Sequence, residues 1–523
     1  MALVALSSLS HAQFDPTKVE VEPEVIARQF PDPVVTAATP AFAADRQTLT
    51  SHTEVFSFLD ALAQRTGRVS IETVGRSQQG RAMALALLTG PRGLDAQLPT
   101  VLLLAQQHGN EPASGEAALA IVQVLANEKS ALLERVNVVV MPRANPDAAE
   151  RFGRDTASGI DVNRDHLLLR TPEAQAITVA VLRYAPQVVL DLHEFTVAGR
   201  WVGKFGAVMR ADALLQAATV GNLSPSVASA QDRYLAAARK ALEAAGHRVD
   251  DYHTSSADPK DQSVSMGGVN VDTGRNVGGL RHAISLLLET RGIGIGRANY
   301  ARRVQSHVLA ALAVIEAAAE DGFALVRMQR EAGAIDAGSA CRGNIAVVVR
   351  QTEQRRTLSF LDAKSGEPRD VDVLWRSSKR LVTERERARP CGYLISPDQH
   401  RAVQRLRMLG IEVTTLGATP QQTAWDVEEF VLEAEAAGQR QDARGAISDS
   451  QNSIRVLRVQ TKPSQLVPVP GSFYVTLNQP LAALVSAALE PDSQNSFAAN
   501  RLLAVDAGQL RRVMQPPPKG FAK

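Results

Sequence analysis

The chain has 523 residues, which is too long for one ordinary hydrophobic core and indicates at least two domains. A hydrophobic fraction of 45% beside 21% charged residues is typical of a globular protein. The net charge of +2 argues against a protein that binds nucleic acid through bulk positive charge.

The N-terminus opens with a short apolar stretch that ends in Ser10-His11-Ala12, with small residues at the two positions that a signal peptidase reads. We interpret residues 1–12 as the back end of a secretory signal, cleaved after Ala12, which predicts a periplasmic or secreted protein. A frayed apolar terminus on a cytoplasmic protein is the alternative. The sequence has no apolar run of the roughly 18 to 20 residues that span a bilayer, so no membrane span is predicted.

Residues 13–45 are rich in Pro, Ala and acidic residues and predict an extended arm. From 46 to 325, short apolar runs alternate with helical patterns, the last being a long amphipathic helix at 298–321. The clearest buried strands are predicted at 136–146, 185–195 and 282–292. Strands that alternate with helices predict an α/β fold: a mixed, mostly parallel sheet with helices on both faces.

The pattern changes after residue 326, and residues 326–523 predict a smaller C-terminal domain of α/β or α+β class, whose role is unknown. Strands are expected at 343–350 and 357–363, a strand, a helix and a strand in 389–417, and a strand followed by a helix in 471–491. The chain has two cysteines, Cys341 and Cys391. They could form a disulfide in an exported protein, and two unrelated buried thiols are the alternative.

The predicted strands of the first domain end in side chains that can bind a metal or move a proton. His108 and Glu111 follow one strand, His193 ends another, and Glu289 ends a third. The carboxyl ends of parallel strands converge on one crevice, so residues that are distant in sequence can meet there. Two imidazoles and a carboxylate suit a catalytic Zn²⁺, which takes three protein ligands and keeps a fourth position open. The pattern predicts one Zn²⁺ per chain, with Glu289 as the general base that activates zinc-bound water.

Each of these signals is weak alone, because an H-x-x-E pair is common by chance and a lone histidine is more often a satisfied core residue. Their combination carries the prediction. His166, His253 and His282 match no motif, and we interpret them as core histidines.

In combination, the motifs resemble those of the zinc metallocarboxypeptidase (carboxypeptidase A-like) family. That family carries H-x-x-E, then an Asn-Arg pair, a distant His and a glutamate near the end of a strand. Here these are "HGNE" (108–111), "NPDAAERFGRDTASGIDVNRDH" (145–166), "DLHEF" (191–195) and "LLLETRG" (286–292). The likeness covers roughly residues 46–325 and implies a carboxypeptidase-like fold with the same zinc ligands and general base. The segment 471–496 resembles tails appended to some bacterial members.

The resemblance also implies substrate-binding residues. Asn163 and Arg164 match the pair that binds the substrate's free carboxylate, to which a planar guanidinium offers two parallel hydrogen bonds. Arg154 matches the arginine that polarises the scissile carbonyl and stabilises its oxyanion. Arg151 is the alternative for that role, and spacing favours Arg154.

The chain departs from the family in lacking a tyrosine some 20 residues before the general base. The sequence between His253 and Glu289 contains no tyrosine, and Tyr252 is too far upstream to be assigned. That tyrosine shapes the substrate pocket, so its absence affects the substrate class more than the hydrolysis.

The resemblance also places a pocket-lining residue about 15 positions before the general base. Counting back gives Gly274, beside Arg275. A glycine leaves room that Arg275 could reach, which predicts a preference for acidic or small polar terminal residues over Lys or Arg. Alternatively, Arg275 points to solvent or pairs with Asp272.

Together the motifs predict a zinc-dependent metallopeptidase that hydrolyses the C-terminal peptide bond of a peptide. The first alternative is a zinc-dependent amidase or deacylase that acts on N-acyl amino acids or cell-wall peptides. The second is an inactive carboxypeptidase-like binding protein, against which the intact ligand set and Glu289 argue. A peptide or an acyl-amino acid is the expected partner, no nucleic acid is expected, and the oligomeric state is not predicted.

Overall fold

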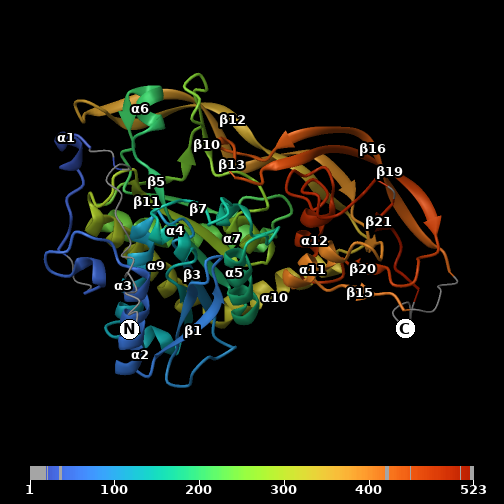
Figure 1. The fold of residues 1–523 in the computed structure, drawn as a ribbon, viewed down its shortest axis with the longest axis horizontal. Coiled ribbons are helices and arrows are strands. Elements are labelled where there is room, and N and C mark those ends of the chain that lie inside the picture. The colour runs from blue at the N-terminus through green and yellow to red at the C-terminus, as the bar shows by residue number, and fades with distance from the viewer. Residues whose placement is uncertain are drawn as a thin grey trace, which may run out of the picture.

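The computed structural model describes residues 19, 22–34, 38–417, 423–447, 449–506 and 508–518. The predicted signal remnant at 1–12 lies outside these residues. Figure 1 shows an N-terminal region of helices and strands beside a C-terminal region built largely from long strands. Among the described residues, none of the helices is both long and apolar enough to pass through a bilayer.

An eight-stranded mixed sheet forms the centre of the N-terminal region. In spatial order its strands are β1 (Val69–Arg76), β2 (Ala82–Leu88), β4 (Asn137–Met141), β3 (Thr100–Ala105), β5 (Val188–Thr196), β11 (Ile284–Ile293), β7 (Ala213–Ala217) and β8 (Val249–Asp251). The middle strands β4, β3, β5 and β11 are parallel neighbours. The pairs β1–β2, β2–β4 and β11–β7 are antiparallel, and β7 pairs parallel with β8. The three strands predicted from sequence are β4, β5 and β11.

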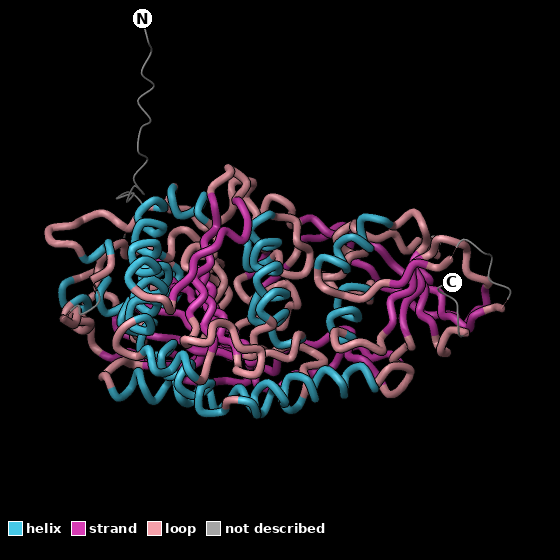
Figure 2. The backbone as a smooth tube through the Cα atoms, turned by 90° about the horizontal axis from the view of Figure 1, so that it is seen from below, coloured by secondary structure: helices cyan, strands magenta, loops and turns pink. Residues whose placement is uncertain are grey.

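Helices cover both faces of this sheet, as predicted, and Figure 2 shows helices on either side of its strands. On one face, side chains such as Leu103 and Leu190 pack against α2 (His52–Arg65), α3 (Pro112–Ala126), α7 (Pro225–Ala244) and α9 (Tyr300–Asp321). On the other face, Leu102 and Val189 pack against α5 (Pro172–Tyr184). Burial on both faces explains why these strands are continuous apolar runs in the sequence.

Shorter elements complete the N-terminal region. They are α1 (Glu24–Ala27), η2 (Pro40–Phe42), η3 (Ser130–Glu134), α4 (Pro146–Glu150), η4 (Val162–Arg164), α6 (Arg200–Phe205) and α8 (Gly274–Leu280). The described part of the arm packs onto the body of the protein. Glu22 pairs with Arg291 at 2.6 Å, and the same guanidinium lies 3.2 Å from the centre of the Phe30 ring.

A second sheet joins the two regions. Its order is β6 (Ala207–Val208), β12 (Asn344–Asp362), β13 (Pro368–Ala388), β10 (Ser263–Met266) and β9 (His253–Thr254). The long hairpin β12–β13 comes from the C-terminal region, but both of its edges pair with strands of the N-terminal region (Figure 1). The strands predicted at 343–350 and 357–363 are one continuous strand, β12.

The C-terminal region contains a six-stranded sheet with three helices. The strands are β15 (Thr414–Thr415), β20 (Phe473–Thr476), β14 (Gly392–Ile395), β21 (Leu510–Val513), β16 (Trp425–Gln439) and β19 (Ser453–Leu466), and the helices are α10 (Phe323–Gly338), α11 (His400–Met408) and α12 (Ala482–Leu489). The predicted strand–helix–strand in 389–417 and strand–helix in 471–491 are present. Cys341 and Cys391 form a disulfide.

A small hairpin lies between β16 and β19, formed by β17 (Gln441–Asp442) and β18 (Gly445–Ala446). No motif or periodicity in the sequence predicts this hairpin. The two regions also share one hydrophobic core, in which Leu168 and Leu280 pack with Tyr393 and Leu484. The C-terminal region is therefore packed firmly against the N-terminal one.

Candidate active site

His108 and Glu111 lie in the tight loop between β3 and α3. Gly109 permits this loop, because a Cβ at that position would overlap the backbone of Ala148 in α4. The loop buries both residues, which are 2% and 1% exposed. His193 lies near the end of the neighbouring parallel strand β5 and is equally buried.

The three side chains meet at one point. Glu111 Oε1 lies 2.7 Å from His108 Nδ1, and Glu111 Oε2 lies 2.8 Å from His193 Nδ1. The two Nδ1 atoms are 3.1 Å apart. Burial opposes the charge of Glu111, but the two imidazoles outweigh it and hold the pKa of Glu111 below its usual range. Glu111 is therefore held as an ionised carboxylate, the form that can bind a metal ion.

A second layer of carboxylates orients the two histidines. His108 Nε2 lies 2.9 Å from Asp161, and His193 Nε2 lies 2.8 Å from Asp191. These contacts assign the proton of each neutral ring to Nε2, so both Nδ1 lone pairs point at the centre of the cluster. Two converging lone pairs, one carboxylate and carboxylates behind the histidines fit a catalytic zinc site.

Glu289 lies beside this cluster. In the parallel pairing of β5 with β11, Glu289 is the register partner of His193, so both side chains emerge at the same level and on the same face. Burial raises the pKa of Glu289 to about 7. Its carboxylate accepts no hydrogen bond from the described residues, which leaves it available to a water molecule or substrate.

Of the two arginines that the sequence offers for the oxyanion role, only Arg154 contacts the cluster. Arg154 Nη2 donates to Asp161 at 2.8 Å, and its Nη1 lies 3.4 Å from Glu111 Oε1. The guanidinium thus lies beside the cluster. Arg151 instead donates to the backbone oxygens of Asp155 and Thr156.

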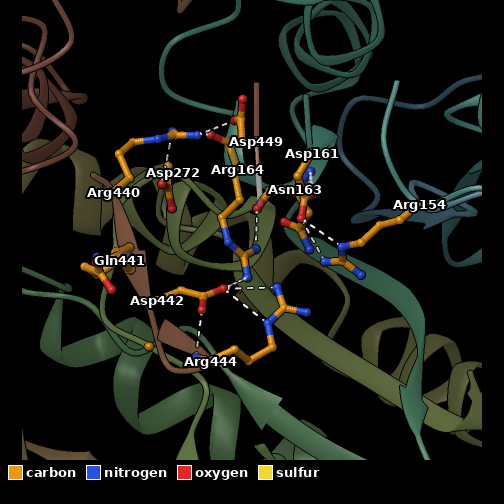
Figure 3. Close-up of polar contacts among 12 residues, drawn as sticks. Arg154, Asp161, Asn163, Arg164, Asp272, Arg440, Gln441, Asp442, Arg444 and Asp449 are labelled. Atoms are coloured by element: carbon orange, nitrogen blue, oxygen red, sulfur yellow. Dashed lines mark hydrogen bonds and ion pairs between the residues drawn. The ribbon is translucent and has the colours of Figure 1, made fainter. Parts of the chain in front are cut away.

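Asn163 and Arg164 lie in the short helix η4, which begins directly after Asp161 in the sequence. Asn163 Nδ2 lies 3.0 Å from His193 Nε2, and its Oδ1 accepts the Gly274 N–H. Arg164 Nη1 donates to the Asn163 carbonyl at 2.7 Å, and its Nη2 donates to Asp442 at 2.6 Å (Figure 3). Asp442 belongs to the small hairpin of the C-terminal region.

Arg275 lies in the same cleft and is 5% exposed. It neither points to solvent nor pairs with Asp272, but donates to the Gly268 carbonyl at 2.8 Å. No carboxylate among the described residues forms an ion pair with it, and burial lowers its pKa to about 10. Gly274 does not supply the expected room, since a Cβ there would meet His166 at 3.0 Å and Asp191 at 3.3 Å.

Each of the three histidines that match no motif makes a hydrogen bond within the protein. His166 Nε2 lies 2.8 Å from Gln107 Oε1, His253 Nδ1 lies 2.8 Å from the Asp251 carbonyl, and His282 Nε2 lies 2.7 Å from the Pro480 carbonyl. Tyr252, which sequence spacing left unassigned, lines the cleft, and burial raises the pKa of its phenol to about 12.

One cleft contains the cluster, Glu289 and the arginines beside it. It is lined by His108, Glu111, Arg154, Asn163, Arg164, His193, Tyr252, Arg275 and Glu289 from the N-terminal region and by Asp442, Ala443 and Arg444 from the small hairpin. The hairpin residues follow no motif, so the sequence does not predict them. The buried pair of Glu194 with Arg303, whose closest atoms are 2.5 Å apart, likewise carries no signal in the sequence.

Comparison with known proteins points to one enzyme family. The family described as zinc carboxypeptidase matches residues 55–181. Carboxypeptidase 2 of Trichophyton rubrum is 30% identical over 463 residues, which cover 86% of this chain and 84% of that protein. Probable carboxypeptidase 2 of Arthroderma benhamiae is 31% identical over 389 residues, covering 73% and 72%. A metallo-carboxypeptidase structure from Burkholderia cenocepacia aligns with a TM-score of 0.39 at 19% identity, covering 51% of this chain and 70% of that one.

The chain belongs to the zinc carboxypeptidase family and is a zinc-dependent metallopeptidase that cleaves C-terminal peptide bonds.

Proposed function

We propose that His108, Glu111 and His193 hold one catalytic Zn²⁺ and that Glu289 is the general base. The convergence of both Nδ1 atoms on Glu111 carries this assignment. When bound, zinc supplies a Lewis acid that makes water acidic enough to react near neutral pH. Glu289 faces the cluster with an unengaged carboxylate, so it takes the proton of the attacking water and passes it to the leaving amine.

The arginines divide the remaining tasks. Arg154, held by Asp161 beside the cluster, donates to the oxygen of the scissile carbonyl as negative charge develops there. Arg164, whose Nη1 donates to the Asn163 carbonyl, binds the terminal carboxylate of the substrate together with Asn163. Tyr252 has a protonated phenol at neutral pH, and it takes the place of the missing pocket tyrosine as a hydrogen-bond donor.

We assign Arg275 to the pocket for the terminal side chain. It is a buried guanidinium without an ion-pair partner among the described residues, and it lines the cleft. An acidic terminal residue would supply the missing counter-charge, whereas Lys or Arg would add a like charge. The preferred substrates are therefore peptides, and by the same chemistry acyl-amino acids, that end in an acidic or small polar residue.

Two further assignments stay proposals. Residues 46–325 form the catalytic domain, and 326–523 form the C-terminal domain. The protein works in the periplasm or outside the cell, which the Cys341–Cys391 disulfide supports because disulfides persist in oxidising compartments.

The ligand and base assignments are tested by His193→Ala and Glu289→Gln. His193→Ala should lose stoichiometric zinc, because one of three ligands is gone. Glu289→Gln should keep one zinc per chain, while kcat falls by about 100-fold or more. Zinc is measured by elemental analysis and kcat with free-carboxylate peptides. Glu331→Gln, on an exposed surface pair, is the matched control and should behave as wild type. Zinc retained by His193→Ala, or near-normal turnover in Glu289→Gln, would contradict the assignments.

A further inference from the structure

The small hairpin at 441–446 brings residues of the C-terminal region into the catalytic cleft. It lies between β16 and β19, yet Asp442 and Arg444 line the same cleft as Glu289 and Arg154. The cleft is therefore formed by both regions of the chain.

Asp442 lies between two guanidinium groups (Figure 3). Its Oδ2 accepts from Arg164 Nη2 at 2.6 Å and from Arg444 Nη2 at 3.0 Å, and its Oδ1 accepts the Arg444 backbone N–H at 2.7 Å. One carboxylate between two arginines leaves a net positive charge. Arg164, Asp442 and Arg444 together can therefore bind an anion.

The base of the hairpin is anchored in the protein interior. Arg440 is fully buried, donates to the Arg164 carbonyl at 2.9 Å and pairs with Asp449 at 2.7 Å. Asn270 Nδ2 donates to the Gln441 carbonyl at 2.7 Å. The hairpin is thus fixed against the backbone of the very arginine whose side chain it contacts.

Arg164 already uses part of its hydrogen-bonding capacity within the protein, although each of its Nη atoms keeps one more N–H donor. Its Nη1 is used by the Asn163 carbonyl and its Nη2 by Asp442. Its Nε is buried and has no partner among the described residues. Arg444 uses Nε and Nη2 on Asp442, while its Nη1 has no hydrogen-bond partner among the described residues. Arg444 is also the more accessible of the two, with 26% of its side chain exposed against 12% for Arg164.

We propose that Arg444 is a substrate-binding residue that shares the terminal carboxylate of the substrate with Arg164, and that Asp442 is a positioning residue that aligns both guanidiniums. This inference rests on the proposed function of Arg164. It gives the C-terminal domain a direct part in substrate recognition, since that domain supplies the second guanidinium of the carboxylate anchor.

The test compares steady-state kinetics of Arg444→Ala and Asp442→Asn with wild type on a peptide that has a free terminal carboxylate. Removing a charge-assisted hydrogen bond should raise KM about 10- to 100-fold in Arg444→Ala, with kcat within about threefold. Arg444→Lys keeps the charge but loses the planar fork, so its KM should be intermediate. Asp442→Asn should raise KM as well, because neither arginine is then held in place.

Two controls separate binding from folding. Arg458→Ala removes an exposed arginine of the same domain and should leave KM unchanged. The second control measures by calorimetry the affinity of the zinc-loaded Glu289→Gln protein for a dipeptide that is blocked at its N-terminus and has a free terminal carboxylate. Adding Arg444→Ala should lower this affinity by the same factor by which it raises KM. This measurement does not depend on turnover.

An unchanged KM and dipeptide affinity in Arg444→Ala would overturn the inference. So would a higher kcat/KM in Asp442→Asn, since Asp442 would then be an inhibitory mimic of the substrate carboxylate. If wild type releases no terminal residue, or Glu289→Gln stays active, the proposed function is wrong. If wild type is active and Glu289→Gln is not, a normal Arg444→Ala overturns the role of Arg444 alone.

Discussion

Arg275 illustrates how a single buried charge can select a substrate. Its guanidinium is 5% exposed and bonds to the Gly268 carbonyl, which is a neutral acceptor. A buried cation without a counter-ion is costly, and that cost decreases when a ligand brings the opposite charge. The same cation penalises a ligand of like charge.

We therefore expect kcat/KM to be higher for a peptide ending in Glu than for the same peptide ending in Lys. In Arg275→Ala the advantage of Glu over Lys should fall by about tenfold or more, which corresponds to roughly 1.4 kcal/mol. A peptide ending in Phe is the internal control, because its terminal side chain carries no charge. A lysine-terminated substrate that is best in wild type would contradict the prediction, as would an order unchanged by the substitution.

The predicted ligands could be found from sequence because each has metal-binding chemistry and lies near the end of a buried strand. Asp161 and Asp191 orient the histidines but carry no such signal, since single carboxylates are common in any sequence. The pocket residue counted back from Glu289 shows the limit of spacing arguments. The room expected at Gly274 is filled by His166 and Asp191, which come from other segments.

At the scale of elements, the strands that are buried on both faces could be predicted from the sequence, whereas the exposed strands could not. β3, β5 and β11 are buried on both faces and are unbroken apolar runs in the sequence. β16 and β19 pair mainly with each other, and most of their side chains are exposed or half-buried. Their buried apolar residues are few and lie among many polar ones, so these strands do not form continuous apolar runs in the sequence.

The disulfide links two elements of the C-terminal region. The sequence did not decide between this bond and two unpaired thiols. Cys341 follows α10 and Cys391 precedes β14, and the bond closes a 50-residue segment that contains the β12–β13 hairpin. In the chain-entropy account, closing a loop of this length stabilises the folded state by about 4 kcal/mol.

The double variant Cys341→Ser with Cys391→Ser should therefore unfold at a temperature several degrees lower than oxidised wild type. Calorimetry with and without a reducing agent measures this difference. The reductant should destabilise wild type and leave the double variant unchanged, which makes the variant its own control. Identical unfolding temperatures for oxidised wild type and the variant would refute the stabilising role.

At the scale of the whole molecule, the two regions are joined by a mixed sheet, a common hydrophobic core and buried charges. Arg440 is the central charge, fully buried, with Asp272 at 3.5 Å and Asp449 at 2.7 Å. The change of sequence pattern after 326 indicates a second domain, but the contacts between the domains come from isolated residues and leave no periodic signal.

Arg440→Met should lower the stability of the entire protein by about 3–5 kcal/mol, because it removes a buried cation that two buried carboxylates share. Asp449 keeps Arg170 as a partner, whereas Asp272 keeps the Asn495 amide, with Arg164, Asp442 and Asp161 as its other charged neighbours. Burial already raises the pKa of Asp272 to about 6, while Arg440 opposes that rise. Losing Arg440 raises this pKa further, above its value of about 3.9 in the unfolded chain.

A carboxyl group whose pKa is raised by folding destabilises the protein as the pH rises through the folded value. The difference in unfolding temperature between wild type and Arg440→Met should therefore be larger at pH 8 than at pH 5. Comparison at the same pH cancels the pH dependence of zinc binding. Arg458→Met, on an exposed pair, should show no difference at either pH. Because the regions share a sheet and a core, calorimetry should give one transition that shifts as a whole. Two transitions, of which one moves alone, would mean that the regions unfold independently.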